Sequence, residues 1–412
     1  MKKNILIILS LFLFSIQCLA KELDDKDRSV FFFQPEFLVG KTLPAHSNFP
    51  ETRLQTVFAL SFGKYMYNPE KSWAVYYNYP AVGITFSKAS LGNDGTLGNA
   101  YTLMPFISFN TSKKLRHSFH IKLGLGASYF THHFDKYENP DNKAIGSTFT
   151  WTFQAALHFN LIASKHFLLN IGGGFIHHSN GHTQLPNLGL NSLLASISAV
   201  VFLSPLDDYH FKKYEKPRIK KSKQFFIELR NGIGIHELGD TDTPLARVKK
   251  SVFSASFGGG IIFKQMVKIK AGFTYRFYSH YYNFILENEP ENYVDYPVLN
   301  SSNLFIYGGF EFLIGHFSID AELGLNIFKP FYKEHSSRFE NDGKFSYTLK
   351  RVFATRLGLR FYAISTAKNP PNNVFIGAHI NANMGQADFS EVSVGFVHVF
   401  NNSRSPNRSA TH

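Results

Sequence analysis

Apolar and polar residues alternate one by one along many segments of the chain, most clearly at residues 119–129 and 317–327. This period of two predicts strands that have one apolar face. The other face carries charges, Lys122 in the first segment and Asp320 and Glu322 in the second. Charges on such a face need a wet or paired interior. The pattern is typical of a transmembrane β-barrel with a polar lumen, although a soluble sandwich produces the same alternation.

The two segments resemble each other and lie roughly 200 residues apart, an offset that suggests an internal duplication. A strand ending at His177 likewise has a counterpart ending at His379. Each half holds about eight strand candidates, which is enough for a minimal closed barrel. We therefore predict an all-β fold of two tandem eight-stranded barrels; one barrel of about sixteen strands is the alternative.

The expected division of the chain follows from its composition. A stretch rich in Lys, Tyr and Pro separates the halves and indicates a basic linker, and the polar C-terminal end indicates a disordered tail. The predicted units are a signal peptide at 1–20, a first barrel at 21–205, the linker at 206–223, a second, degenerate barrel repeat at 224–400 and the tail at 401–412.

The N-terminal segment indicates the compartment. Lys2 and Lys3 precede an almost wholly apolar run at 5–16, and a polar run begins after Ala20. A basic start, a short apolar run and a small residue at the cut are typical of a signal peptide. The run is short for a bilayer-spanning helix. Export combined with the strand pattern favours the bacterial outer membrane over a soluble sandwich.

Composition narrows the chemistry further. Cys18 is the single cysteine and leaves with the signal peptide, so the mature chain has no thiol for redox chemistry or metal ligation. The formal charge is +13, and 44 Phe and 20 Tyr make the chain rich in aromatic residues. An exported chain of this kind is expected to meet an anionic lipid surface rather than nucleic acid.

One loop between two strands combines chemically competent side chains. Phe175 continues the outward face of its strand, and His177 and Ser179 follow in the same phase. On the next strand Asn191 is in phase with the outward Leu193. If the chain enters the barrel from the periplasm, this loop is extracellular and the three side chains lie level with the outer leaflet.

A serine beside a histidine suggests nucleophilic catalysis. Ser179 would be the nucleophile, His177 the general base that takes its proton, and Asn191 the group that holds the imidazole. Asn180 and Asn187 would donate hydrogen bonds to the oxyanion. A bare His and Ser pair near a loop is more often just interfacial polarity, so the surrounding motif matters.

That motif is His-x-Ser-Asn, a short spacer and Pro-Asn-x-Gly, and it comprises His177, Ser179, Asn180, Pro186, Asn187 and Gly189. It resembles the PagL-type lipid A 3-O-deacylases, also called acyloxyacyl hydrolase-like barrels. The stretch 137–147 also looks like members of this family. The resemblance covers roughly residues 30–205. It implies an eight-stranded outer-membrane barrel that hydrolyses an ester-linked acyl chain of lipid A, with lipid A or lipopolysaccharide as partner, Gly189 in a supporting role, and no cofactor.

The chain departs from the family at Asn191, where the deacylases carry a glutamate. An asparagine can hold the imidazole, but it cannot offset the positive charge that forms there. In serine proteases a comparable change lowers kcat by about ten-thousand-fold. Glu138 or Asp141, on a loop expected at the same end of the barrel, would be a substitute acid.

The second half lacks an equivalent trio. Asn381 stands where a nucleophile beside His379 is needed, and Glu391 on the next strand falls on the inward face. We expect His379 and Glu391 to be a lumen pair and this half to be structural or accessory.

Two alternatives complete the expectations. His177, His178 and His182 suggest zinc, but no acid or thiol accompanies them and His178 is expected to point inward, so we predict no metal. The rival to an esterase is a non-catalytic outer-membrane barrel that binds lipopolysaccharide or serves surface structure. A pore is disfavoured because small barrels are filled with side chains. A homodimer is left open.

Overall fold

The alternating segments form long antiparallel strands. The computed structural model describes residues 27–45, 48–112, 114–206, 222–239, 244–339, 343–384 and 386–400. The expected signal peptide, nearly all of the expected linker and the expected tail lie outside these residues. The strands of the first half are β1 (Val30–Leu43), β2 (Gln55–Tyr65), β3 (Ala81–Ser90), β4 (Asn99–Asn110), β5 (Phe119–Phe130), β6 (Phe149–Ala163), β7 (Phe167–Ser179) and β8 (Leu190–Phe202).

The second half repeats this arrangement. Its strands are β9 (Lys223–Gly239), β10 (Pro244–Phe263), β11 (Val267–Tyr278), β12 (Ser302–Ile314), β13 (Phe317–Phe328), β14 (Phe353–Tyr362), β15 (Asn372–Asn383) and β16 (Gln386–Phe400). The two similar segments noted above are β5 and β13, which are the fifth strands of their halves. The strands that end near His177 and His379 are β7 and β15, the seventh in each.

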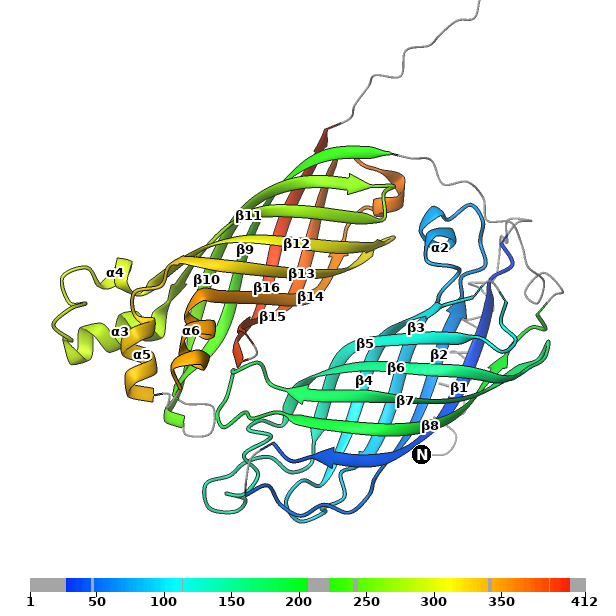
Figure 1. The fold of residues 1–412 in the computed structure, drawn as a ribbon, viewed down its shortest axis with the longest axis horizontal. Helices are drawn as coiled ribbons and strands as arrows, with labels where there is room; N and C mark the ends of the chain where they lie inside the picture. Colours follow the sequence, from blue (N-terminus) through cyan, green and yellow to red (C-terminus); the bar gives the residue numbers. More distant parts are fainter. Residues whose placement is uncertain are drawn as a thin grey trace, which may run out of the picture.

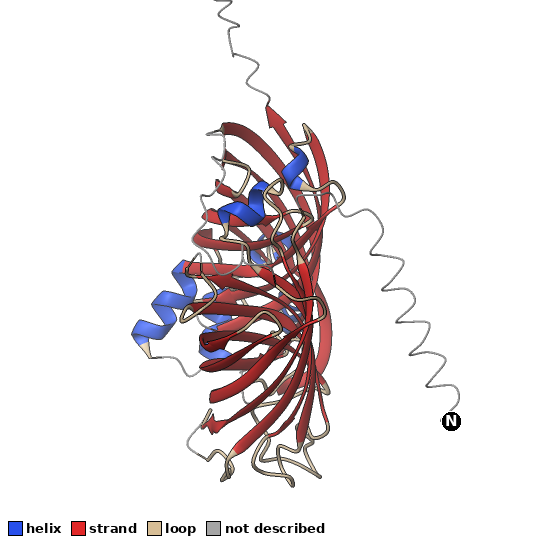
Figure 2. Ribbon diagram, turned by 90° about the vertical axis from the view of Figure 1, so that its right-hand side faces the viewer, coloured by secondary structure: helices blue, strands red, loops and turns tan. Residues whose placement is uncertain are grey.

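Each half closes on itself. β1 pairs with β2 on one side and with β8 on the other, and β9 pairs with β10 and β16 in the same way. The described strands therefore form two closed eight-stranded barrels with no free sheet edge (Figure 1). Strands make up most of the described molecule, with a few short helices at the ends of the strands (Figure 2). This confirms the prediction of tandem barrels, and the alternative of a single sixteen-stranded barrel is wrong.

Short helices occupy the connections between strands. At one end of the second barrel lie α3 (Ser279–Asn288), α4 (Pro297–Asn300), α5 (Tyr332–Phe339) and α6 (Lys344–Val352) (Figure 1). α2 (Ser72–Tyr76) lies between β2 and β3, and the 3-10 turn η2 (Thr366–Lys368) lies between β14 and β15. Both are at the end of their barrel that is remote from the end where α3 to α6 lie (Figure 1). Among the described helices, none is long and apolar enough to cross a membrane.

The interior of the first barrel holds the charges that the alternation placed there. Lys122 is 2% exposed, and its Nζ lies 3.4 Å from Oε2 of Glu36. The other carboxylate oxygen of Glu36 lies 2.9 Å from Nε2 of His158. Buried charges are tolerated when they are paired and hydrogen-bonded in this way. The lumen thus contains a paired ionic group at its centre.

The second barrel contains a larger ionic network. Arg360 donates to Glu228 at 2.7 Å and to Glu311 at 3.2 Å, and Arg230 donates to Glu322 at 2.7 Å. These side chains are almost wholly buried. Among the described residues, these paired side chains therefore occupy the lumen of the second barrel.

The outer faces of both barrels are apolar and exposed. Phe58, Leu193 and Ile197 are 59%, 54% and 50% exposed on the first barrel, and Val394 is 59% exposed on the second. A soluble protein rarely exposes so many large apolar side chains. The arrangement of apolar outside and polar inside is that of strands which face lipid.

The two barrels contact each other at both ends. At the end that carries α2, the hydroxyl of Tyr77 donates to the carbonyl of Met266 at 2.9 Å, and Lys264 lies 5.7 Å from the ring centre of Tyr76. At the other end, Trp151 Nε1 donates to Ser390 Oγ at 2.9 Å. The barrels therefore lie side by side with their longer loops at the same end (Figure 1).

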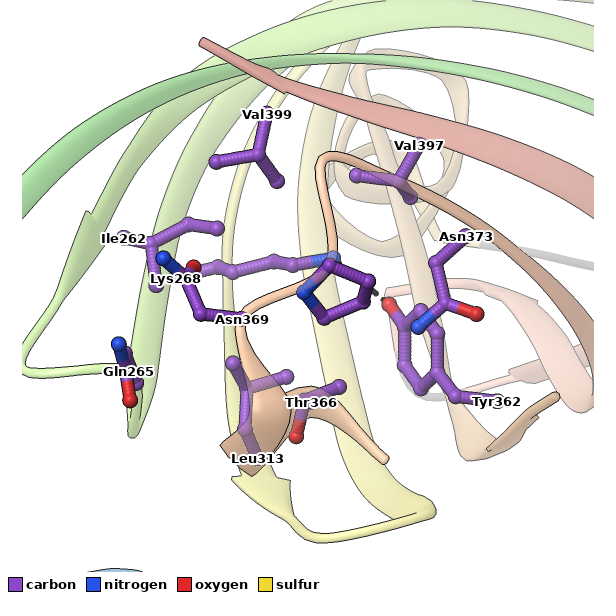
Figure 3. Close-up of a pocket in the computed structure, with 11 residues that line it drawn as sticks. Ile262, Gln265, Lys268, Leu313, Tyr362, Thr366, Asn369, Asn373, Val397 and Val399 are labelled. Carbon is purple, nitrogen blue, oxygen red and sulfur yellow. Dashed lines mark hydrogen bonds between the residues drawn. The ribbon is translucent and has the colours of Figure 1, made fainter. Parts of the chain in front are cut away.

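A pocket lies at the end of the second barrel that is remote from α3 to α6 (Figure 3). Two of its polar side chains pair with each other, because Lys268 Nζ donates to the hydroxyl of Tyr362 at 2.6 Å, and that hydroxyl donates to Glu311 of the ionic network at 2.7 Å. The pocket is therefore the end of the internal ionic network. It lies at the opposite end of the molecule from Ser179.

Candidate active site

The candidate residues stand where β7 and β8 meet the loop between them. His177 on β7 is the direct cross-strand partner of Asn191 on β8. Further along the same outward faces, Ile171 and Leu193 are 43% and 54% exposed. His177 and Asn191, which are partly exposed, continue this face toward the loop. Directly opposite side chains on one face of a sheet lie close enough to interact.

His177 and Asn191 form a hydrogen bond. The ring Nδ1 of His177 lies 2.7 Å from Oδ1 of Asn191. Since an amide oxygen only accepts, the imidazole carries its proton on Nδ1 and its lone pair on Nε2. The neutral amide thus selects the tautomer that a general base requires. It adds no negative charge beside the ring.

The hydroxyl of Ser179 has two donors from the loop. Asn187 Nδ2 donates to Ser179 Oγ at 2.9 Å, and the backbone N–H of Gly181 donates to the same oxygen at 3.2 Å. Ser179 is 7% exposed. Within the described residues no hydrogen bond joins Ser179 to His177. The structure therefore places His177 and Ser179 two residues apart on one face of β7, with the hydroxyl of Ser179 hydrogen-bonded to the loop.

Asn187 and Asn180 have different surroundings. Asn187 points its Nδ2 at Ser179, while its Oδ1 accepts from the backbone N–H of Asn180 at 3.0 Å. Asn180 instead donates its side-chain amide to the carbonyl of Gln184 at 2.6 Å. Asn187 and the Gly181 N–H are thus the donors nearest the serine, and the Asn180 side chain braces the loop. The sequence pattern did not single out Gly181.

Gly189 lets the loop approach the histidine. Its φ is +77°, which favours glycine, and a Cβ there would lie 3.0 Å from Cε1 of His177. Its N–H donates to the carbonyl of Ala144 at 3.0 Å, so the loop between β5 and β6 packs against it. The close approach keeps the imidazole between Gly189 and Asn191.

The two acids considered as substitutes are exposed on the loop between β5 and β6. Asp141 and Glu138 both have exposed side chains, and the backbone N–H of Glu138 donates to Asp135 at 3.1 Å. Among the described contacts, neither carboxylate bonds to His177. Asn191 is the partner of its Nδ1.

A shallow hollow lies on the outer wall beside the site. Gly173 pairs with Ala195, and Phe175 with Leu193, on the two strands that carry His177 and Asn191. The hollow therefore begins about two residues, roughly 7 Å, from the His177–Asn191 pair. Small residues produce the depression and larger apolar ones border it: Val39, Gly40, Gly173, Gly174, Phe175, Leu193, Leu194 and Ala195.

The other two histidines of the segment do not converge with His177. His178 points into the barrel, where its Nδ1 lies 2.9 Å from Thr152 Oγ1. His182 stacks on His236 of the second barrel at 5.2 Å between ring centres. Burial lowers the pKa of His182 to about 4. The described residues contain no group of three His, Cys, Asp or Glu side chains arranged to hold a metal ion.

In the second barrel, His379 and Glu391 are cross-strand partners that face the lumen. Arg356 Nη2 lies 2.8 Å from His379 Nδ1 and 2.8 Å from Glu391 Oε1. The guanidinium thus bridges the pair, and the period of two alone did not indicate it. Asn381, two residues after His379 on β15, accepts from Arg276 at 2.6 Å. This half presents a structural ionic cluster where the first half presents its outward trio.

The sequence profile of the lipid A 3-O-deacylase (PagL) family matches residues 58–199. This confirms the resemblance expected from the motif and places it in the first barrel, over less than half of the chain. A search of curated proteins found no match.

Solved structures give weaker likenesses. The crystal structure of the outer membrane enzyme PagL is 14% identical, with 40% of this chain and 97% of that chain covered and a TM-score of 0.26. The outer membrane channel DcaP of Acinetobacter baumannii is 7% identical, with 90% and 97% covered and a TM-score of 0.17. At TM-scores this low, neither adds to the fold described above.

Proposed function

We propose that the first barrel is an outer-membrane esterase that removes an ester-linked acyl chain from lipid A by a serine-histidine mechanism. The observation that carries the proposal is the 2.7 Å bond between His177 Nδ1 and Asn191 Oδ1 on the outward face, two residues from Ser179. The family profile over residues 58–199 supports the same reaction class.

In the proposed reaction, His177 Nε2 takes the proton of Ser179 as Oγ attacks the ester carbonyl. The carbonyl oxygen becomes an oxyanion beside Oγ, and the donors nearest to it are the Asn187 amide and the Gly181 N–H, which bond to Ser179 Oγ in the free protein. Collapse of this intermediate breaks the bond to the sugar oxygen, which receives the proton from His177. Water then attacks the acyl-serine, with His177 again the base, and releases the fatty acid and the free serine.

The position of the site suits a lipid substrate. His177 and Asn191 lie on the wall that exposes Leu193 and Ile197, so the reacting groups are level with the edge of the apolar surface. The hollow beside Gly173 and Ala195 lies on the same wall and begins about two residues, roughly 7 Å, from the His177–Asn191 pair. We infer that this hollow receives the acyl chain that is cut, because an extended hydrocarbon gains by covering small apolar residues.

Two observations favour a second candidate, a barrel that binds lipopolysaccharide without cutting it. Asn191 is neutral, so it cannot stabilise the imidazolium that forms during the reaction. Ser179 also bonds to Asn187 and Gly181, with no hydrogen bond to His177 in the described structure. Esterase activity then requires a small movement of Ser179 or His177 when the substrate binds, as hydrogen bonds of catalytic groups often tighten only in the complex.

Mass spectrometry of lipid A incubated with the purified full chain tests the proposal. The parent is compared with Ser179→Ala and with a control, Ser164→Ala, whose serine lies in the turn between β6 and β7 at the far end of the barrel. We expect the parent and the control to remove one acyl chain and Ser179→Ala to leave lipid A intact. Unchanged lipid A in all three reactions, over several lipid A types, rejects the esterase in favour of the binding barrel.

A further inference from the structure

We propose that the second barrel positions the catalytic loop of the first through Glu237 and Ser390, which contact the loop at 180–187. This inference rests on the proposed function and deepens it. It assigns a role to a half in which Asn381 stands at the position that Ser179 occupies in the first half. The loop in question supplies both hydrogen bonds to Ser179 Oγ, from Asn187 and from Gly181.

Glu237, near the end of β9, holds the far side of the loop. Its carboxylate accepts from the backbone N–H of Leu185 at 2.8 Å, and its own backbone N–H donates to the carbonyl of His182 at 3.2 Å. Glu237 is 1% exposed. A buried carboxylate that accepts from a backbone amide makes a strong, directional bond. The loop is therefore attached to the second barrel by two bonds to one residue.

Ser390, on β16, holds the near side. Its hydroxyl accepts from Trp151 Nε1 at 2.9 Å and donates to the carbonyl of Asn180 at 3.3 Å. Trp151 is the cross-strand partner of Ser179, so Ser390 lies over the flank of the site formed by β6. A Cβ on Gly181 would come within 2.3 Å of Ser390 Oγ. The second barrel thus packs closely against Gly181, whose N–H donates to Ser179 Oγ.

These contacts bear directly on the reacting serine. Asn180 precedes Gly181, and Leu185 stands two residues before Asn187, so each donor to Ser179 lies within two residues of an anchored position. Without the second barrel, the Leu185 N–H loses the Glu237 carboxylate, and the Asn180 carbonyl keeps only the Thr183 hydroxyl as a donor. A displacement of about 1 Å at such donors costs on the order of a hundredfold in rate. Glu237 and Ser390 are therefore positioning residues.

The test compares Glu237→Ala, Glu237→Gln and Ser390→Ala in the full chain. Glu287→Ala serves as the control, because Glu287 is an exposed carboxylate on α3 of the same barrel. We expect Glu237→Ala to speed amide hydrogen exchange at 180–187 by about ten- to a hundredfold, the loss of one charge-assisted hydrogen bond. Its kcat on lipid A should fall at least about tenfold with KM nearly unchanged. Glu237→Gln retains an accepting oxygen, so its hydrogen exchange at 180–187 and its kcat should both be close to those of the parent.

Fluorescence reports the Ser390 contact without reference to activity. The chain has 2 tryptophans, so Trp73→Phe leaves Trp151 as the reporter. In that background Ser390→Ala should change the Trp151 emission, because the indole N–H loses its acceptor. The rate at which a fluorophosphonate labels Ser179 should fall in Ser390→Ala and Glu237→Ala and stay constant in Glu287→Ala.

The outcomes separate the two proposals. Unchanged exchange, emission and labelling in the variants overturn the positioning role. A loosened loop with unchanged kcat also overturns it, since the contacts would then be structural only. If the parent leaves lipid A intact while the variants loosen the loop and slow the labelling of Ser179, the proposed function fails and the positioning of Ser179 stands.

Discussion

Restoring a carboxylate beside His177 should make the first barrel a faster esterase. Asn191→Asp has the same length as the native side chain and can keep the 2.7 Å bond to Nδ1. The tautomer of the imidazole is then unchanged, and the substitution adds one negative charge. Asn191→Ala is the opposite perturbation, because it removes the acceptor and leaves the ring free to turn.

The expected gain follows from Coulomb's law. With the carboxylate about 4 Å from the centre of the imidazolium, the attraction is about 1 kcal/mol in bulk water and about 4 kcal/mol at a protein surface. Because His177 and Asn191 are partly exposed, an intermediate value of about 2 kcal/mol applies, which is roughly thirtyfold in kcat. The ten-thousandfold effect in serine proteases includes a wrong tautomer, which the accepting Oδ1 avoids here.

Release of fatty acid from lipid A in detergent micelles measures the effect, with kcat and KM determined for the parent, Asn191→Asp and Asn191→Ala. We expect kcat to rise in Asn191→Asp, to fall in Asn191→Ala and to have similar KM in all three. Ser179→Ala provides the background rate. An active parent whose kcat is unchanged or lower in Asn191→Asp would refute the reasoning, since the charge on the imidazolium would then not limit the reaction.

Three further predictions concern the surroundings of the trio. Ala195→Phe fills the hollow and should raise KM for long acyl chains at least about tenfold, whereas the control Ala127→Phe, on the outer face of β5, should leave KM unchanged. Equal KM values in the two variants would exclude the hollow as the acyl site. Gly189→Ala brings a Cβ to 3.0 Å from His177 at a positive φ, so the imidazole should shift and kcat should fall about tenfold or more. An unchanged kcat in the folded variant would count against the importance of this close approach. Burial lowers the pKa of His182 to about 4, so the undocked loop binds a proton at a higher pH than the docked loop, and docking should weaken as the pH falls from about 6.5 to 4. Hydrogen exchange at 180–187 should then become faster, and equal protection at pH 7.5 and 4.5 would exclude this.

The sequence predicted the local and repetitive features of the molecule. A period of two assigns each side chain of a strand to one face, so the inward position of Lys122 and the shared outward face of His177 and Asn191 follow from counting. The similarity of the halves indicated two barrels, because each half contains enough strands to close. The motif from His177 to Gly189 indicated the family resemblance that the profile over residues 58–199 confirms.

The hydrogen bonds within the loop were beyond the reach of such counting. Period two does not apply between Asn180 and Gly189, where turns and side-chain bonds set the path of the backbone. In the folded loop, the side-chain amide of Asn187 donates to Ser179 and that of Asn180 donates to the carbonyl of Gln184. The predicted oxyanion role of the two asparagines stays a prediction.

By itself the sequence determined the strands, their faces and the chemistry available at the end of β7, and it favoured two closed halves over one larger barrel. Only the tertiary structure decided that Glu237 and Ser390 meet the loop beside Ser179, at sequence separations of 52 and 210 residues from their partners. The physical reason is that strand periodicity depends on neighbours a few residues apart. Contact between two closed barrels depends instead on how their finished outer surfaces fit together.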